Sequence, residues 1–285
     1  MIRISGYLKV ITVIFIDFIV FYSMSDSMTA ALGISGLIAL YVWLGGYLAL
    51  RKEGAINMSK LPYGDRSRLE TAKTQLCADI KRESNVDLSR LRLYLVPHDE
   101  DLQATAYGAN CISVSQGTLH FADPLQLNAV LAHEASHLLH CDPAFNRAVF
   151  CSVTLLIGAL SLFSAVTLFI VFLLFAVLNC FRSWLGVLVY QGTSKVVSGM
   201  FAMLQRAIVS MYRLLFMFVS RHAEYRSDGY ACDLGYGLQL AHFLSIAAPE
   251  AQGCQSLREA LYRSHPPTPQ RIARLEARMQ RALII

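Results

Sequence analysis

The stretch His133-Glu134-Ala135-Ser136-His137 decides how this 285-residue chain is interpreted. On an α-helix, residues four apart project from the same face, so His133 and His137 can present two imidazoles to one ion. A hydrolytic zinc site uses about three protein ligands and keeps one position open for water. The two histidines therefore leave one ligand to be found elsewhere, and Glu134 beside them is placed to act as a general base.

The helix that carries this stretch has recognisable ends. Asp123 is a good N-cap residue, and Pro124 suits the first helical position. The helix is expected to run to about His140, with Asp142 capping or bracing its end and Pro143 just beyond. If His140 bound the metal together with a third ligand, the position for water would be lost, so we interpret it as a neighbouring or exposed side chain.

Long apolar stretches flank this helix and predict a membrane protein. The composition is 55% hydrophobic and only 16% charged, against about 25% charged residues in soluble domains. Residues 8–22 and 30–50 form two apolar runs, the second long enough to cross a bilayer. Residues 148–181 carry no charge and predict a third span, and residues 184–219 predict a fourth whose limits the pattern leaves open.

Basic residues set the expected orientation. Arg3 and Arg51 flank the first two spans, and the loop between the spans has no Lys or Arg, so the positive-inside rule places the soluble parts in the cytoplasm. The seven cysteines form no Cys-x-x-Cys pair, which fits a reducing compartment. The net charge is +5, but no basic and aromatic array accompanies it, so we expect no binding to nucleic acid.

The soluble parts predict a small α+β domain. Residues 65–85 have the pattern of an amphipathic helix, and residues 91–96 and 111–114 are expected to be strands. Further helices are expected at residues 221–234, 238–247, 257–263 and 269–281.

A third ligand must lie on the same side of the membrane as His133 and His137. Glu224 and Asp228 stand four apart on the helix expected after the apolar region, so they face the same way. Glu224 is the expected ligand, and Asp228 is expected to accept the free ring N–H of a ligand histidine. A solvated helix face is the alternative for both carboxylates. Ligation requires an even number of membrane crossings between the two motifs, which the two predicted spans satisfy.

Together these motifs resemble the HtpX family of membrane zinc metallopeptidases, relatives of the CAAX prenyl proteases. The likeness is carried by residues 133–137, by Ser220-Arg221-x-x-Glu224-Tyr225-x-x-Asp228, and by Ser264-His265-Pro266 followed by Arg271-Ile272. The order of these motifs, the two preceding apolar runs and the apolar region between the first two motifs match as well. The resemblance implies zinc bound by His133, His137 and Glu224, with Glu134 as the catalytic carboxylate.

The resemblance also gives roles to two residues near the C-terminus. It implies that His265 approaches the cleft, where it would hydrogen-bond the oxyanion of the tetrahedral intermediate; a structural role in a stiff, proline-rich link is the alternative. Arg271 would brace that link or the zinc helix. One segment departs from the family, which usually has Asn-Ala-Phe-Ala where this chain has Gln103-Ala104-Thr105-Ala106. That segment lines the substrate cleft in the family, so the departure concerns substrate preference and not the metal chemistry.

The sequence thus predicts a mainly α membrane protein, with four transmembrane helices and a cytoplasmic, gluzincin-like α+β zinc protease domain that contains a small sheet. Residues 1–50 would form two spans, 51–147 a first catalytic part, 148–220 a transmembrane hairpin, and 221–285 a second catalytic part with the third ligand. The strand at 111–114 is expected to pair with an extended substrate by β-augmentation.

The expected function is that of a zinc endopeptidase of a bacterial inner membrane, which cleaves misfolded or membrane-associated proteins on the cytoplasmic side. The family implies a role in membrane protein quality control. Polypeptides and the lipid bilayer are the expected partners, and the oligomeric state stays open. Two alternatives remain: a zinc-binding but inactive membrane scaffold, against which an intact Glu134 argues, and a transporter or structural protein with a fortuitous motif, which would bind no zinc.

Overall fold

The chain divides into two compact units in the computed structural model, which describes residues 2–178, 182–247 and 266–282. Unit 1 comprises Met1–Ala148 and Met217–Ile285, and unit 2 comprises Val149–Phe216. All the predicted site residues that the structure describes belong to unit 1. Unit 2 consists of two helical segments.

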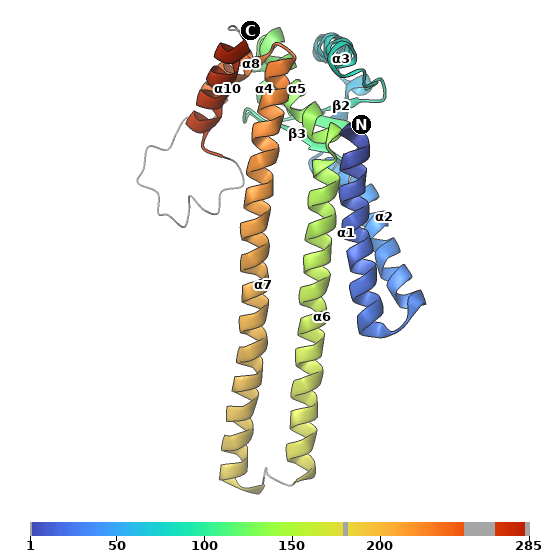
Figure 1. The fold of residues 1–285 in the computed structure, drawn as a ribbon, viewed down its shortest axis with the longest axis vertical. Coiled ribbons are helices and arrows are strands. Elements are labelled where there is room, and N and C mark those ends of the chain that lie inside the picture. The colour runs from blue at the N-terminus through green and yellow to red at the C-terminus, as the bar shows by residue number, and fades with distance from the viewer. Residues whose placement is uncertain (1, 179–181, 248–265, 283–285) are drawn as a thin grey trace. The chain divides into compact units, whose positions relative to one another are not determined.

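Four helices in the described part of the chain are long and apolar enough to cross a membrane. Helices α1 (Ile2–Ser25) and α2 (Met28–Lys52) pack side by side in unit 1, joined by a tight turn (Figure 1). The other two are α6 (Asp142–Val177) and α7 (Trp184–Asp233), which supply unit 2. The predicted mainly α architecture with four apolar spanning helices is confirmed.

The two helices of unit 2 contact each other through polar and aromatic side chains. Gln205 Nε2 donates a hydrogen bond to Ser161 Oγ at 2.9 Å, and the rings of Phe163 and Phe201 meet edge to face at 5.8 Å. Lipid offers no hydrogen-bonding groups of its own, so a polar side chain there is stabilised by a partner on a neighbouring helix. The pairing explains how the unusually polar fourth span accommodates Gln205.

Both long helices extend further than the sequence predicted. Residues 221–233 are helical as expected, but they continue α7 from residue 184 without a break, so the predicted separate helix is wrong. Continuing the helix through polar residues 191–195 keeps their backbone groups hydrogen-bonded, which matters most where water is scarce. Likewise α6 begins at Asp142, since Pro143 in the first turn lacks only an N–H that a helix start leaves unpaired anyway.

Unit 1 also contains a four-stranded sheet in the order β1-β2-β4-β3. Strands β2 (Arg92–Val96) and β4 (Cys111–Ser115) pair in parallel at its centre and confirm the two predicted strands. Strands β1 (Ile56–Asn57) and β3 (Ala104–Tyr107) pair antiparallel at its two edges, and the sequence predicted neither. Because β4 is paired on both sides, the prediction that residues 111–114 receive the substrate is wrong; β3 is the neighbouring open edge.

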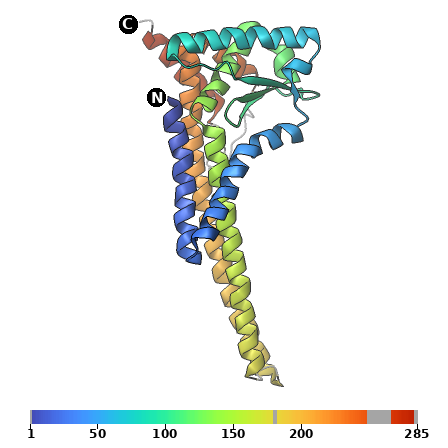
Figure 2. The same cartoon turned by 90° about the vertical axis from the view of Figure 1, so that its right-hand side faces the viewer.

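Helices and sheet of unit 1 share one hydrophobic core. Helix α3 (Tyr63–Ser84) buries Leu69, Leu76 and Ile80 on one face and packs against α5 (Pro124–Leu139). Figure 2 shows the long α3 above the sheet. The remaining elements are η1 (Met58–Lys60), α4 (Gln116–Phe121), α8 (Gly237–Ala247) and α10 (Thr268–Ala282), of which α8 contacts both α5 and α10.

A capping box fixes the start of α5. The Asp123 carboxylate accepts hydrogen bonds from the backbone amides of Leu125 and Gln126, and the Gln126 side chain accepts one from the Asp123 amide. Such a cap contributes about 1 kcal/mol to helix stability. It also sets the first residue of the helix, and therefore which face carries His133 and His137. The predicted helix start is confirmed.

Candidate metal centre

Helix α5 presents His133 and His137 on one face. Their Nε2 atoms lie 3.2 Å apart, and the rings meet edge to face with 4.9 Å between centroids. The side chains are only 9% and 13% exposed. Two neutral imidazoles that point their Nε2 atoms at each other can share at most one proton, so a cation between them suits both lone pairs.

Helix α7 brings Glu224 to the same point. Its Oε2 lies 3.5 Å from His133 Nε2, and its Oε1 lies 3.7 Å from His137 Nε2. Among the described residues these three form the single group suited to hold a metal ion, with their ligand atoms within 4.8 Å of one another. Ligand atoms at 2.0–2.2 Å from a tetrahedral ion lie about 3.3–3.6 Å apart, so the spacing and the donor set fit one such ion.

A carboxylate stands behind each histidine. Asp228 Oδ1 lies 2.9 Å from Nδ1 of His133, and Asp142 Oδ2 lies 2.9 Å from Nδ1 of His137. A carboxylate at the far ring nitrogen selects the tautomer and orients the ring, which leaves Nε2 available as a ligand. The contact of Asp142 with His137 was missed by sequence reasoning, although an acidic residue five positions after a candidate ligand, next to a helix start, is a signal that could have indicated it.

Two arginines hold these carboxylates. Arg271 of α10 donates to both oxygens of Asp228, at 2.8 Å and 2.6 Å, and its Nη1 lies 3.2 Å from Glu224 Oε2. Arg226 of α7 forms an ion pair with Asp142. Burial raises the pKa of Asp228, but its contacts with Arg271 and His133 outweigh burial and lower the pKa below its ordinary value. Arg271 was predicted to brace the proline-rich link or the zinc helix; among the described residues it pairs with two carboxylates of α7.

Glu134 interacts both with the histidine pair and with the sheet. It is partly buried, and its carboxylate accepts a hydrogen bond from the backbone amide of Ala106 in β3. Burial raises the pKa of Glu134 above its ordinary value, although the two histidines act in the opposite direction. A carboxylate with a raised pKa is a stronger base than an ordinary one.

Two other candidate residues lie apart from this group or outside the described structure. His140 ends α5, and its Nδ1 lies 2.8 Å from the Ser136 carbonyl oxygen, so the ring is engaged with its own helix. His265 lies outside the described residues, and its predicted approach to the cleft stays a prediction.

The family model for peptidase family M48 matches residues 68–279, which is most of the chain. The chain belongs to peptidase family M48. This M48 chain is 29% identical to Protease HtpX of Pasteurella multocida over 273 residues, covering 87% of this chain and 85% of that protein. It is 28% identical to Protease HtpX of Vibrio parahaemolyticus over 275 residues, with 87% and 85% covered. The crystal structure of S. mikatae Ste24p covers 89% of this chain, which in turn covers 65% of Ste24p, at 17% identity and a TM-score of 0.42.

Membership of M48 makes this chain a metallopeptidase, which confirms the predicted enzyme class and the predicted resemblance. Its four long apolar helices in the described residues agree with the predicted membrane protein. Its substrates are polypeptides, and its cofactor is a metal ion.

We expect Asp142→Asn in this M48 peptidase to weaken metal binding about 10- to 100-fold. The amide keeps the shape of the side chain but loses the charge that orients His137 and pairs with Arg226. The affinity is measured by competition for zinc with a chelator of known strength. Asp233→Asn is the matched control, because Asp233 also belongs to unit 1 but pairs with Arg278. Equal affinities of Asp142→Asn and wild type would contradict the orienting role.

Proposed function

We propose that this protein is a zinc-dependent endopeptidase of a bacterial inner membrane, which cleaves misfolded or membrane-associated polypeptides on the cytoplasmic side. The observation that carries the proposal is the convergence of His133, His137 and Glu224 with Glu134 beside them. Two imidazoles and one carboxylate are the protein ligands of a hydrolytic zinc site that keeps a position open.

Each of these residues has a definable task. Zinc held by His133, His137 and Glu224 would supply a Lewis acid towards water and the scissile carbonyl. Glu134 takes a proton from the attacking water and passes it to the leaving amine. Asp142 and Asp228 keep the histidine rings turned so that both Nε2 atoms face inward.

The open edge of β3 supports pairing with the main chain of an extended substrate. The amide of Ser115 donates to the carbonyl of Gln103, and hydrogen-bonded residues alternate along an antiparallel pair. Ala104 and Ala106 therefore direct their N–H and C=O groups away from β4. Since the amide of Ala106 reaches the Glu134 carboxylate, a strand added at this edge would lie beside the catalytic group. Main-chain pairing favours unfolded segments and discriminates little between side chains.

The cytoplasmic placement rests on the distribution of basic residues. Arg51 and Lys52 lie in the last turn of α2, where the chain leaves the apolar pair for the sheet. We propose that residues 51–147 and 221–285 supply the catalytic part, and that residues 1–50 and 148–220 supply the membrane part.

Cleavage of unfolded casein and of a membrane protein tests the proposed activity. The purified protein is expected to cleave both, to stop after chelation and to resume when zinc at about one ion per chain is restored. Zinc binding without any cleavage would support an inactive scaffold instead. A chain that binds no zinc would contradict the proposed cofactor.

Ala104→Pro is expected to raise KM for an unfolded substrate about tenfold, with the zinc content unchanged. Proline removes one N–H from the open edge of β3 and is tolerated there because that N–H does not pair with β4. Ala104→Gly is the matched control, since it keeps the N–H. Both KM and kcat are measured with a casein substrate and a short fluorogenic peptide, and an unchanged KM for Ala104→Pro would argue against pairing at this edge.

A further inference from the structure

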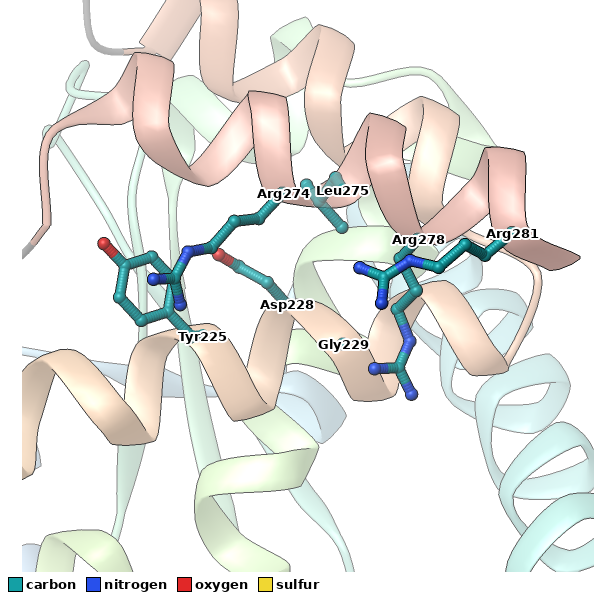
Figure 3. A pocket seen from close by; sticks show the side chains of 7 residues that line it. All are labelled: Tyr225, Asp228, Gly229, Arg274, Leu275, Arg278 and Arg281. Carbon is teal, nitrogen blue, oxygen red and sulfur yellow. The ribbon is translucent and has the colours of Figure 1, made fainter.

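A pocket of about 260 Å³ lies between α7 and α10, and Asp228, which contacts His133, forms part of its lining. Its lining is rich in guanidinium groups (Figure 3). Arg274 lies over the ring of Tyr225 at one end, and Arg278 and Arg281 lie at the other. The complete lining is Tyr225, Asp228, Gly229, Arg274, Leu275, Arg278 and Arg281.

The positive charges of this pocket are only partly balanced. Arg278 donates to Asp233 at 2.9 Å and 2.8 Å, and Asp228 is neutralised by Arg271. Among the described residues, no carboxylate lies within ion-pair distance of Arg274 or Arg281. Two guanidinium groups thus face one cavity without a counter-charge from the described chain, and such groups bind oxyanions through paired N–H donors.

The donors are held in place before any ligand arrives. The guanidinium carbon of Arg274 lies 3.6 Å from the centroid of the Tyr225 ring, and the Tyr225 hydroxyl donates to Gln270 Oε1 at 3.2 Å. Gly229 forms part of the wall, and a Cβ there would come within 3.3 Å of Nη1 of Arg278. The glycine therefore lets the Arg278 side chain lie close to α7. Because Arg274 is already stacked on Tyr225, it loses less side-chain entropy when a ligand binds.

We propose that this pocket binds a small phosphate-class oxyanion from the aqueous phase. The cavity is larger than one phosphate ion, so an ion with part of its water shell, or a small phosphate ester, would fit. In unit 1, α10 lies at the end opposite the α1–α2 turn (Figure 1), which favours a dissolved anion over a lipid headgroup. The proposal does not depend on the proteolytic function.

Binding would also affect the metal centre. An anion between Arg274 and Arg281 relieves the repulsion along α10, and Arg274 in turn stacks on Tyr225 of α7. The same helix carries Arg271, which holds Asp228 and Glu224. The bound anion therefore stabilises the docked position of α10, and its binding appears as a higher melting temperature.

Full-length, zinc-loaded protein in detergent is titrated with inorganic phosphate, against sodium chloride at equal ionic strength. Equilibrium dialysis with radiolabelled phosphate is expected to show one saturable site per chain, and the melting temperature is expected to rise by about 2–5 °C near saturation. Arg274→Gln and Arg281→Gln should each weaken binding about tenfold. Arg281 is the decisive position, because its side chain donates a hydrogen bond to the Ala277 carbonyl of its own helix. Replacing Arg281 therefore removes a donor from the pocket while α10 stays docked.

Arg66→Gln is the matched control, since it removes one exposed arginine that pairs within α3. If phosphate binding survives both arginine substitutions, the ion binds elsewhere, for example at the metal, and the proposal is overturned. The proposal is also overturned if phosphate binding does not saturate at tens of millimolar phosphate. If nanodiscs that contain phosphatidylglycerol raise the melting temperature and phosphate does not, the pocket binds a lipid headgroup. Tighter binding of an acidic peptide than of phosphate would assign it to a polypeptide. Either result overturns the dissolved oxyanion.

Discussion

Glu134→Gln is expected to reduce kcat by about 10²- to 10⁴-fold while the protein keeps its zinc. The amide has nearly the same shape and can still accept the hydrogen bond from Ala106, so the local packing is preserved. It cannot take a proton from water, however, and general-base catalysis is lost. The three proposed ligands are separate side chains, so metal binding should be unaffected.

The decisive measurement compares kcat for a fluorogenic peptide with zinc content by mass spectrometry. Glu70→Gln serves as the control, because Glu70 is exposed on α3 and pairs with Arg66. Cleavage by Glu134→Gln at the rate of wild type would disprove the proposed mechanism. A parallel loss of zinc and activity would leave the role of Glu134 as a base unsupported.

Glu224→Ala is expected to weaken zinc binding more than the loss of a carboxylate that only orients a ligand histidine, which weakens it about 10- to 100-fold. The substitution leaves two imidazoles as the protein ligands and deprives Arg271 of one of its two carboxylates. Activity should fall in proportion to bound zinc. Chelator competition gives the affinity, and the melting temperature shows whether the fold persists.

Glu276→Ala is the matched control, since Glu276 is an exposed glutamate on α10. If Glu224→Ala binds one zinc per chain with wild-type affinity, Glu224 is no ligand and the proposed site is wrong. Glu224→Asp provides a graded case: the carboxylate remains but is one methylene shorter, so we expect an affinity between those of wild type and Glu224→Ala.

Local spacing predicted much of this structure. The four-residue interval between His133 and His137 fixes their common face on any helix, and Asp123 with Pro124 marks where that helix begins. The apolar runs likewise predicted the four spanning helices, because length and composition alone are sufficient.

Features that depend on partners far along the chain were harder to predict. Strand β3 has the sequence Ala-Thr-Ala-Tyr, whose short side chains give little alternation; its pairing with β4 defines it as a strand. The sequence left the limits of the fourth span open around the polar residues 191–195, and backbone hydrogen bonding keeps α7 continuous through them. The ion pair of Asp142 with Arg226 joins residues of two helices far apart in the sequence and has no local pattern, unlike the contact of Asp142 with the nearby His137.

The proposed ligands occur in two sections of the chain, with the whole apolar hairpin between His137 and Glu224. A ribosome therefore completes α6 and adds most of α7 before it adds the carboxylate, and Arg271 follows later still. A nascent chain has no complete set of ligands during its own insertion. With the proposed ligand set, hydrolysis by this chain would begin only after Glu224 has been added.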